Sequence, residues 1–371
     1  MKLRYNYRAR VGSQAERVLV EEWRDVSWLW NQAVTAKKYG YWVSDKDLTF
    51  WRNDPETAWL KKGSSVVQQQ TLRTFWASKG KKRYKSLKKD QPSLQYTRFG
   101  FTLKDGVLKL AGGIKISVVW SRELPSVPSS VRVYRDVLGQ WWVSFVVEVE
   151  QEQLPATGKS IGIDWGVKEI ATTTSDLHDL LHPEHGKKSA QTLGRYQRQM
   201  ARRKPTPGAK ASRGYKEAKR STALTYAEIR NQRQDTARKW VRAVVRDHDQ
   251  IAVEDFKPKF MAKNRGLAKK AADAAIGATK RELIEYAKRV GRKVVLVPPA
   301  YTTMDCSNCE TRAKSPLDLS ERVFECYACG LIIPRDKNSA RVVLAAAGFN
   351  RADVESIRPG KKPSRVSTLA A

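Results

Sequence analysis

Four cysteines confined to one short segment constrain this chain more than any other feature. They form two pairs, Cys306-x-x-Cys309 and Cys326-x-x-Cys329, with 16 residues between the pairs. Each CxxC turn presents two thiolates together, and two such turns supply the four ligands of a tetrahedral zinc ion. Because sulfur would fill all four positions, the predicted zinc is structural rather than catalytic. We expect this zinc ribbon to occupy residues 302–330.

Paired cysteines also occur in disulfides and in redox sites, and both fit this sequence less well. Disulfides are typical of exported proteins, and the basic start of the chain, MKLRYNYRARVGSQ, lacks the apolar h-region of a signal peptide. A single CxxC would suit a redox site, but here two matched pairs occur together. We therefore expect a cytoplasmic, bacterial-type protein that binds zinc.

The charge of the chain points to a polyanionic partner. Among 371 residues, 70 Lys and Arg stand against 38 Asp and Glu, which gives a formal net charge of +32. Such a surplus repels itself in a folded protein, so DNA, RNA or an anionic membrane is the ordinary reason for it. A membrane span needs about 18–20 consecutive apolar residues, and no run in the sequence approaches this length. The sequence predicts nucleic-acid binding and no membrane, and it leaves the oligomeric state open.

The first half of the chain combines two periodicities. Between residues 15 and 38, apolar side chains recur at helical spacing: Leu19, Trp23, Val26, Trp30 and Ala33. From residue 97 the period changes to two, as in antiparallel strands. We expect an antiparallel β-barrel formed by residues 1–14 and 91–150, with a helical bundle inserted at residues 15–90.

The second half begins after a linker at residues 151–158. Strands and helices then alternate, which predicts an α/β domain made of residues 159–301 and 331–350. The chain is thus predicted to be an α/β multidomain protein. Residues 351–371 are polar, and we expect them to form a loose tail.

Aromatic and basic residues are concentrated near the N-terminus. Seven of the twelve tryptophans precede residue 77. Most are expected to pack a small helical core, and one or two could instead stack on unpaired bases. The run GKKRYKSLKKD at residues 80–90 has no period, which predicts a solvated loop or, beside a nucleic acid, phosphate contacts.

Three acids lie at the ends of core elements, far apart in the sequence. Asp164 lies in the apolar strand IGIDWGV, Glu254 ends the apolar strand IAVEDF, and Asp336 precedes the last helix. A buried carboxylate is costly unless it is paired or binds a metal. Asp336 alone would suit an ordinary N-cap. Because such ends meet at one edge of an α/β sheet, we expect the three side chains to converge.

Converging carboxylates repel one another, and divalent cations remove that repulsion. Two cations about 3.5–4 Å apart, bridged by an acid, form the two-metal site of nucleases. Mg²⁺ suits such a site because its ligands are hard oxygens and few protein groups are needed. The acids and the charge together indicate a phosphodiester hydrolase.

Four motifs, in this order, resemble the TnpB family of insertion-sequence-encoded proteins related to type V CRISPR nucleases. They are GIDWGVKEIATTTSD, IAVEDF, CSNCETRAKSPLDLSERVFECYACG and PRDKNSA. The order of first Asp, Glu, zinc ribbon and last Asp resembles the split RuvC pattern of that family. The segments SREL, PSSVRV and GQWWVSFVVEVE are also similar to its β-barrel, so the resemblance covers most of the chain.

The resemblance implies an RNase H-like (RuvC) nuclease domain with an inserted zinc ribbon. It implies an RNA-guided DNA endonuclease, encoded by a transposable element and linked to transposition and DNA recombination. Asp164, Glu254 and Asp336 would be the catalytic acids, binding Mg²⁺ or in its place Mn²⁺. The four cysteines would bind Zn²⁺. The partners would be a guide RNA from the transposon end and double-stranded target DNA beside a short adjacent motif.

Several functions stay open at this point. The chain could be an RNA-guided DNA-binding regulator that does not cut, or a miniature type V CRISPR effector. A guide-free nuclease such as a junction resolvase, or a recombinase of transposon ends, fits the large N-terminal half less well. The motifs also depart from the family pattern at Trp165, often aliphatic, at Glu310, usually Gly, and at Ser339, usually Ala.

Overall fold

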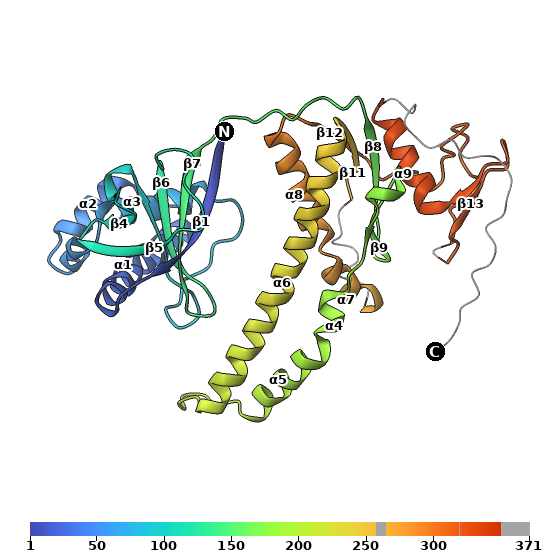
Figure 1. Cartoon of the computed structure of the whole chain (residues 1–371). Coiled ribbons are helices and arrows are strands. Elements are labelled where there is room, and N and C mark those ends of the chain that lie inside the picture. Colours follow the sequence, from blue (N-terminus) through green and yellow to red (C-terminus); the bar gives the residue numbers. More distant parts are fainter. Residues whose placement is uncertain (257–264, 319, 350–371) are drawn as a thin grey trace. The chain divides into compact units, whose positions relative to one another are not determined.

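The computed structural model describes residues 1–256, 265–318 and 320–349 of the chain. The chain divides into two compact units, Met1–Glu150 and Gln151–Ala371 (Figure 1). The expected tail at residues 351–371 lies outside the described residues.

The helices of the first unit form where the apolar stripes predict them. They are α1 (Ser13–Lys38), α2 (Asp45–Asn53), the short 3₁₀ helix η1 (Ala58–Lys62) and α3 (Ser65–Ala77). The helix expected at residues 15–38 is therefore confirmed. Ser44 and Asp47 cap α2 reciprocally, which satisfies two of its first backbone N–H groups. One end of α1 buries Leu19 and Val26 against the sheet of this unit, and the other end packs on α3.

The sheet of the first unit is open, so the expected closed β-barrel is wrong. Its seven antiparallel strands follow the order β2-β6-β7-β1-β5-β4-β3. The strands are β1 (Lys2–Arg10), β2 (Ser93–Thr97), β3 (Phe101–Lys104), β4 (Val107–Leu110), β5 (Ile114–Val119), β6 (Ser130–Arg135) and β7 (Trp141–Glu148). The edge strands β2 and β3 are consecutive and joined by the 3₁₀ turn η2 (Arg98–Gly100). A turn this short brings the two edges together at one end without giving them a paired ladder.

The basic run after α3 is attached to α1 instead of being a free loop. The Asn31 side chain accepts a hydrogen bond from the backbone N–H of Lys85 (2.7 Å) and donates one to its carbonyl (3.1 Å). The indole of Trp30 donates to the carbonyl of Arg83 at 3.0 Å. The ammonium of Lys85 lies over the rings of Trp23 and Trp30, 4.5 and 4.2 Å from their centroids. Burial there lowers the pKa of Lys85 to about 8.

The second unit is built on a mixed five-stranded sheet of order β10-β9-β8-β11-β12. Its strands are β8 (Ser160–Trp165), β9 (Glu169–Thr173), β10 (Leu180–Leu181), β11 (Gln250–Glu254) and β12 (Lys293–Val297). Strands β8, β11 and β12 are parallel, whereas β9 runs antiparallel to β8. The α/β layer predicted for this half is confirmed.

Helices cover both faces of this sheet (Figure 1). The helices of the second unit are α4 (His185–Lys188), α5 (Ala190–Arg202), α6 (Arg213–Asp247), α7 (Arg265–Ala274), α8 (Ile276–Arg289) and α9 (Arg335–Ala346), with the 3₁₀ turn η3 (Asp176–His178) after β9. Apolar side chains of α6 and α8 pack on one face against Ile161 and Ile163 of β8. Helix α9 covers the other face, where Val343 and Leu344 contact Ala252 of β11.

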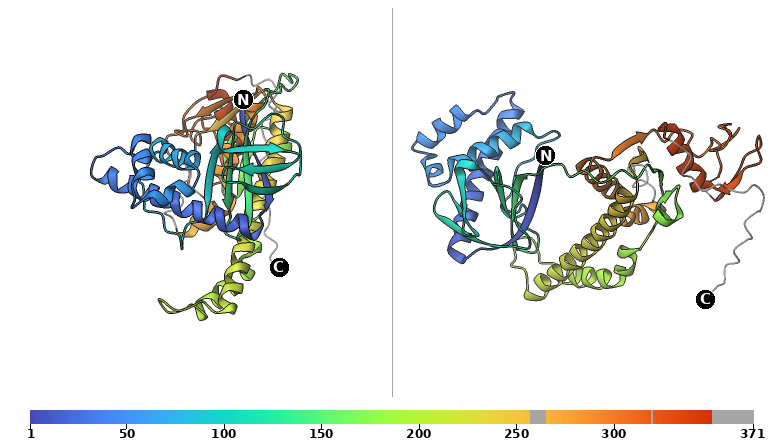
Figure 2. Two further views of the ribbon diagram at one scale, coloured as in Figure 1. Left: turned by 90° about the vertical axis from the view of Figure 1, so that its left-hand side faces the viewer. Right: turned by 45° about the horizontal axis from the view of Figure 1, so that its top comes forward.

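Gly162 lets α9 approach the sheet closely. A Cβ atom added there would lie 2.1 Å from the backbone oxygen of Ala340 and 2.8 Å from Leu344. Any larger residue in this position would push the helix away. Between β12 and α9 in the sequence, the cysteine segment adds the small hairpin β13 (Val323–Glu325) and β14 (Ile332–Pro334), and α9 starts directly after β14 (Figure 2).

Candidate active site and metal centre

Asp164 and Glu254 come from neighbouring parallel strands at the same level. Strand β8 pairs with β11 in a register that aligns Ile163 with Val253. Asp164 follows the first of these residues and Glu254 follows the second. Side chains alternate along a strand, and Gly162 and Ala252, two residues earlier, face α9. Both acids therefore face α9, and their carboxyl groups are hydrogen-bonded to each other.

The environment of this pair favours a shared proton. Burial raises the pKa of Asp164 well above its usual value, and the charges of Glu254 and Asp336 raise it further. Burial also raises the pKa of Glu254. Asp164 is 9% exposed and Glu254 is 6% exposed. Such a pair favours the form that keeps one proton.

Asp336 lies near this pair but outside a compact cluster. It is the second residue of α9, and the N-cap is Pro334, so the alternative role of Asp336 as N-cap is wrong. Its Oδ1 lies 3.4 Å from Arg335 Nε, and its Oδ2 lies 4.0 Å from Arg322 Nη1. Among residues 1–256, 265–318 and 320–349, one group of three or more Asp, Glu, His or Cys side chains has all its ligand atoms within 4.8 Å of one another, and that group is the four cysteines. The three acids do not form such a group.

The residue after Asp336 fixes the first turn of α9 to the sheet. The ammonium of Lys337 contacts Asp176 Oδ1 at 2.6 Å and Asp179 Oδ2 at 2.7 Å, and it donates to the carbonyl of Thr173 at 2.9 Å. These three acceptors belong to the end of β9 and the turn that follows. Lys337 therefore restricts where the neighbouring Asp336 can lie.

Asn338 joins the same turn of α9 to the cysteine segment. It is fully buried. Its Oδ1 accepts from the backbone N–H of Ser307 at 2.9 Å, and its Nδ2 donates to the carbonyl of Asp305 at 2.8 Å. These two backbone groups flank Cys306. The side chain thus ties the first cysteine turn to the helix that carries Asp336.

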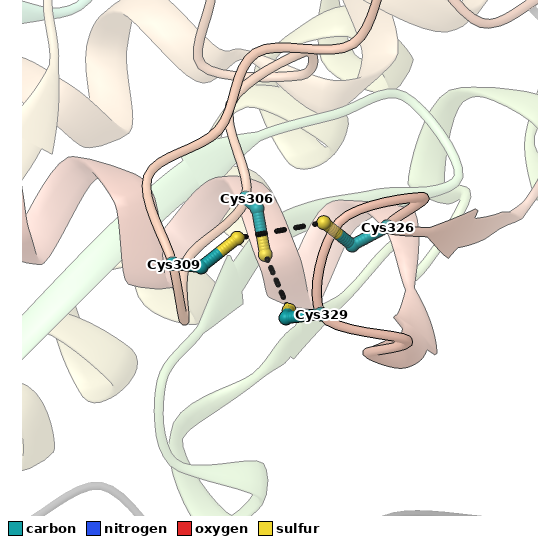
Figure 3. Close-up of side chains that lie close together, drawn as sticks. All are labelled: Cys306, Cys309, Cys326 and Cys329. Carbon is teal, nitrogen blue, oxygen red and sulfur yellow. Dashed lines mark hydrogen bonds between the residues drawn. The ribbon is translucent and has the colours of Figure 1, made fainter.

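The four cysteines form a cluster whose size suits a tetrahedral metal (Figure 3). The Sγ atoms of Cys306 and Cys329 are 3.7 Å apart, and those of Cys309 and Cys326 are 3.5 Å apart. All four Sγ atoms lie within 4.8 Å of one another, so they could hold a metal ion. Zn–S bonds of about 2.3 Å at tetrahedral angles place sulfurs about 3.8 Å apart, close to these values.

The two cysteine turns share one backbone design. The N–H of Glu310 bonds to the carbonyl of Cys306, and the N–H of Gly330 bonds to that of Cys326, each at 2.9 Å. Both residues have positive φ, 62° for Glu310 and 70° for Gly330. Glycine adopts this conformation freely, whereas a residue with Cβ is strained. The departure from glycine at position 310 therefore has an energetic cost in the first turn.

Two further residues explain how the strand ends are held. The indole of Trp165 is buried against Trp240 of α6 and donates to the carbonyl of Glu254 at 3.2 Å, which fastens β8 to β11 beside the acid pair. Asp255, adjacent to Glu254, forms an ion pair with Lys280 of α8 at 2.6 Å. Neither these contacts nor those of Lys337 and Asn338 were expected, since each joins residues far apart in the sequence.

The histidines form contacts of an ordinary structural kind. His178 bonds to Asp247 at 3.0 Å, His182 to the carbonyl of Val167 at 3.1 Å, His185 to Thr236 at 3.0 Å and His248 to the carbonyl of Val244 at 2.9 Å. In the described part of the chain, every helix is too short or too polar to cross a bilayer.

Two family descriptions match the second unit and the end of the first. The family described as "Probable transposase" matches residues 144–265. The "Cas12f1-like, TNB domain" matches residues 277–343, which include all four cysteines.

Two relatives match nearly the full chain. A protein of Streptomyces pristinaespiralis, named as a candidate RNA-guided DNA endonuclease, is 34% identical over 343 residues, covering 89% of this chain and 83% of the relative. InsQ of Escherichia coli (strain K12), named in the same way, is 26% identical over 363 residues, covering 89% of this chain and 85% of the relative.

A solved structure shares the fold. It is described as a cryo-EM structure of a Cas12f1–sgRNA–target DNA complex. The match has a TM-score of 0.57 at 11% identity and covers 92% of this chain and 98% of that chain. At this identity the likeness concerns the fold alone.

Proposed function

This chain belongs to the TnpB family, and from that membership we propose that it is an RNA-guided DNA endonuclease encoded by a transposable element. The observation that supports a cutting enzyme is the hydrogen-bonded pair of Asp164 and Glu254 beneath α9, with Asp336 close enough to raise the pKa of Asp164. A buried acid pair with an acidic neighbour is destabilising unless protons or cations neutralise it.

We assign the binding of two divalent cations, Mg²⁺ or Mn²⁺, to Asp164, Glu254 and Asp336. When bound, such ions activate a water and stabilise the leaving 3′-oxygen of a phosphodiester. The charges of Glu254 and Asp336 both raise the pKa of Asp164, so all three acids would contribute to holding the ions. Asp164, whose pKa is raised by burial and by its two acidic neighbours, would lose its proton when the ions bind. Lys337 and Asn338 hold the helix on which Asp336 lies.

The four cysteines are proposed to bind a structural Zn²⁺. Their Sγ spacing fits tetrahedral thiolate coordination, and all four positions are taken by sulfur. The residues from 302 to 330 would then form the zinc ribbon inserted into an RNase H-like (RuvC) domain. Because Asn338 contacts the backbone on both sides of Cys306, the ribbon would position α9 and with it Asp336.

The proposed partners are a guide RNA from the transposon end and double-stranded DNA beside a short motif. The net charge of +32 supports binding to the phosphates of both. Base pairing between guide and target would supply sequence specificity, as in other RNA-guided nucleases, and the protein would read only the adjacent motif.

The test is to express the protein with its native flanking DNA and to sequence the RNA that copurifies. The complex is then incubated with matched and mismatched duplex DNA, with and without Mg²⁺. Guided cutting should require Mg²⁺ and be abolished in Asp164→Ala, Glu254→Ala and Asp336→Ala. RNA and target binding should persist in all three, and Glu228→Ala on the exposed side of α6 serves as the matched control.

The outcomes separate the remaining alternatives. A defined RNA with target binding but no cutting by the wild-type complex would identify a regulator. Loss of binding equal to the loss of cutting in the three variants would mean that the acids are structural. No defined RNA would leave a guide-free nuclease.

A further inference from the structure

A cleft of about 440 Å³ opens on the helical part of the first unit. It lies between the segment that follows α1 and the last turns of α3. Its lining residues include Trp42 and Trp76, Leu72 and Ala77, and the charged residues Asp45 and Arg73. The cleft therefore combines flat aromatic surface with one ion pair.

The aromatic surface is held in place but left uncovered. The rings of Trp42 and Trp76 stack with centroids 4.0 Å apart and planes 18° apart. The indole N–H of Trp76 donates to the carbonyl of Val43 at 2.9 Å, which fixes its orientation. Trp42 nevertheless stays 66% exposed, so much of its ring surface faces solvent. A rigid, exposed indole is the kind of surface on which a nucleobase stacks.

Two more exposed aromatics precede Trp42 in the chain. Tyr39 is 74% exposed and Tyr41 is 71% exposed. Three large aromatic side chains exposed within four residues form an apolar patch, which in a soluble protein commonly marks an interaction site. The tryptophans of the nearby core differ from this patch: Trp28 and Trp51 are partly buried and pack edge to face with each other.

Cations flank the cleft on both sides. Arg73 lies in its wall and pairs with Asp45 at 3.2 Å, an exposed ion pair that phosphate can replace at low cost. Lys37 and Lys38 end α1 directly before the aromatic patch. Two exposed lysines, Lys79 and Lys81, also follow Ala77 within a few residues. Charge of this sign beside an aromatic face suits the phosphates that join stacked bases.

We propose that this cleft binds an unpaired nucleotide, with its base stacked on Trp42 and its phosphate on Arg73. The proposal rests on the proposed function, because an RNA-guided nuclease holds two single strands, the guide RNA and the DNA strand displaced from the target. Either strand offers the same chemistry. Sequence specificity is not expected, since every base has a flat face.

The test measures dissociation constants of the purified full-length protein for short single-stranded RNA and DNA. Each strand is compared with an abasic strand of equal length, which keeps the phosphates and removes the bases. Trp42→Ala should weaken binding to the normal strands by about 5–150-fold, the effect of losing one base–aromatic stack. It should leave binding to abasic strands unchanged. Tighter binding of RNA identifies the guide as the source, and tighter binding of DNA identifies the displaced strand.

Two further variants separate stacking from folding and from charge. Trp42→Phe should retain affinity, whereas Trp42→Leu, which keeps apolar contact with Trp76, should lose it. Arg73→Ala should weaken normal and abasic strands alike and reduce the dependence of affinity on salt. The matched control is Phe50→Ala, because Phe50 is 67% exposed on α2 and lies outside the cleft.

The proposal is overturned if Trp42→Ala binds normal strands as tightly as Phe50→Ala does. It is also overturned if the loss is equal on abasic strands, or if Trp42→Leu binds as well as Trp42→Phe. Failure of guided cutting together with a normal Trp42 effect would instead refute the proposed nuclease and leave the nucleotide site standing.

Discussion

Replacing Asn338 by Ala tests whether the attachment of the cysteine cluster to α9 fixes the position of Asp336. The substitution removes two hydrogen bonds, of 2.9 Å from Ser307 and 2.8 Å to Asp305, from a side chain with no exposed surface. Each such bond contributes about 0.5–1.5 kcal/mol net, so the expected loss of stability is about 1–3 kcal/mol. For a unit of this size, that loss lowers the melting temperature by about 2–4 °C per kcal/mol.

The assay has two readouts besides unfolding. The first is the rate at which a chelating dye removes metal from the cysteine cluster, which should rise because the Cys306 turn is no longer held against α9. The second is guided cutting, which should fall more than target binding because Asp336 loses its fixed position. Asn308→Ala is the matched control: it also removes an amide beside the cluster, but Asn308 is exposed and its contact with Cys329 Sγ is 3.6 Å long.

The reasoning is refuted if Asn338→Ala releases metal and cuts DNA at the rates of Asn308→Ala. A drop in melting temperature alone, with both rates unchanged, would show that Asn338 stabilises the fold without linking the two sites.

Asp164→Asn should raise the melting temperature of the Mg²⁺-free protein, measured without a chelator that would remove metal from the cysteines. The pKa of Asp164 is raised in the folded state, so the stability that this group contributes is present at low pH and is lost as pH rises. The gain in melting temperature should therefore grow with pH. An equal gain at every pH would contradict this. Affinity for Mg²⁺, measured by calorimetry, should increase with pH because the cation displaces the proton shared by Asp164 and Glu254; a flat profile would argue against a shared proton. Glu310→Gly should stabilise the first cysteine turn by about 0.5–1 kcal/mol in chemical unfolding, since the strain at φ 62° disappears and glycine loses part of the gain to entropy. Cys306→Ser should reduce both folded yield and zinc content by elemental analysis, and an unchanged yield with no zinc in the wild type would contradict the zinc assignment.

Local patterns predicted much of this protein well. The spacing of the two CxxC turns indicated one four-sulfur cluster, because each turn is a short-range structure whose geometry depends on adjacent residues. Helical periodicity located α1, and the change of period to two located the strands of the first unit. The apolar strands around Asp164 and Glu254 indicated buried acids, since the flanking residues on the same strands had to be in a core.

Contacts between distant segments were not predictable in this way. Alternation indicated strands but not their edges, so a barrel was expected where the structure has an open sheet with β2 and β3 as its edge strands. The placement of Asp336 beside the acid pair depends on α9 lying close to Gly162 and on its attachment through Lys337 and Asn338. The exposed stack of Trp42 on Trp76 likewise joins the end of one helix to the end of another. Composition and spacing by themselves determined which chemical groups this protein has, whereas only tertiary packing decided which of them meet, because packing depends on the shapes of surfaces that are remote in the sequence.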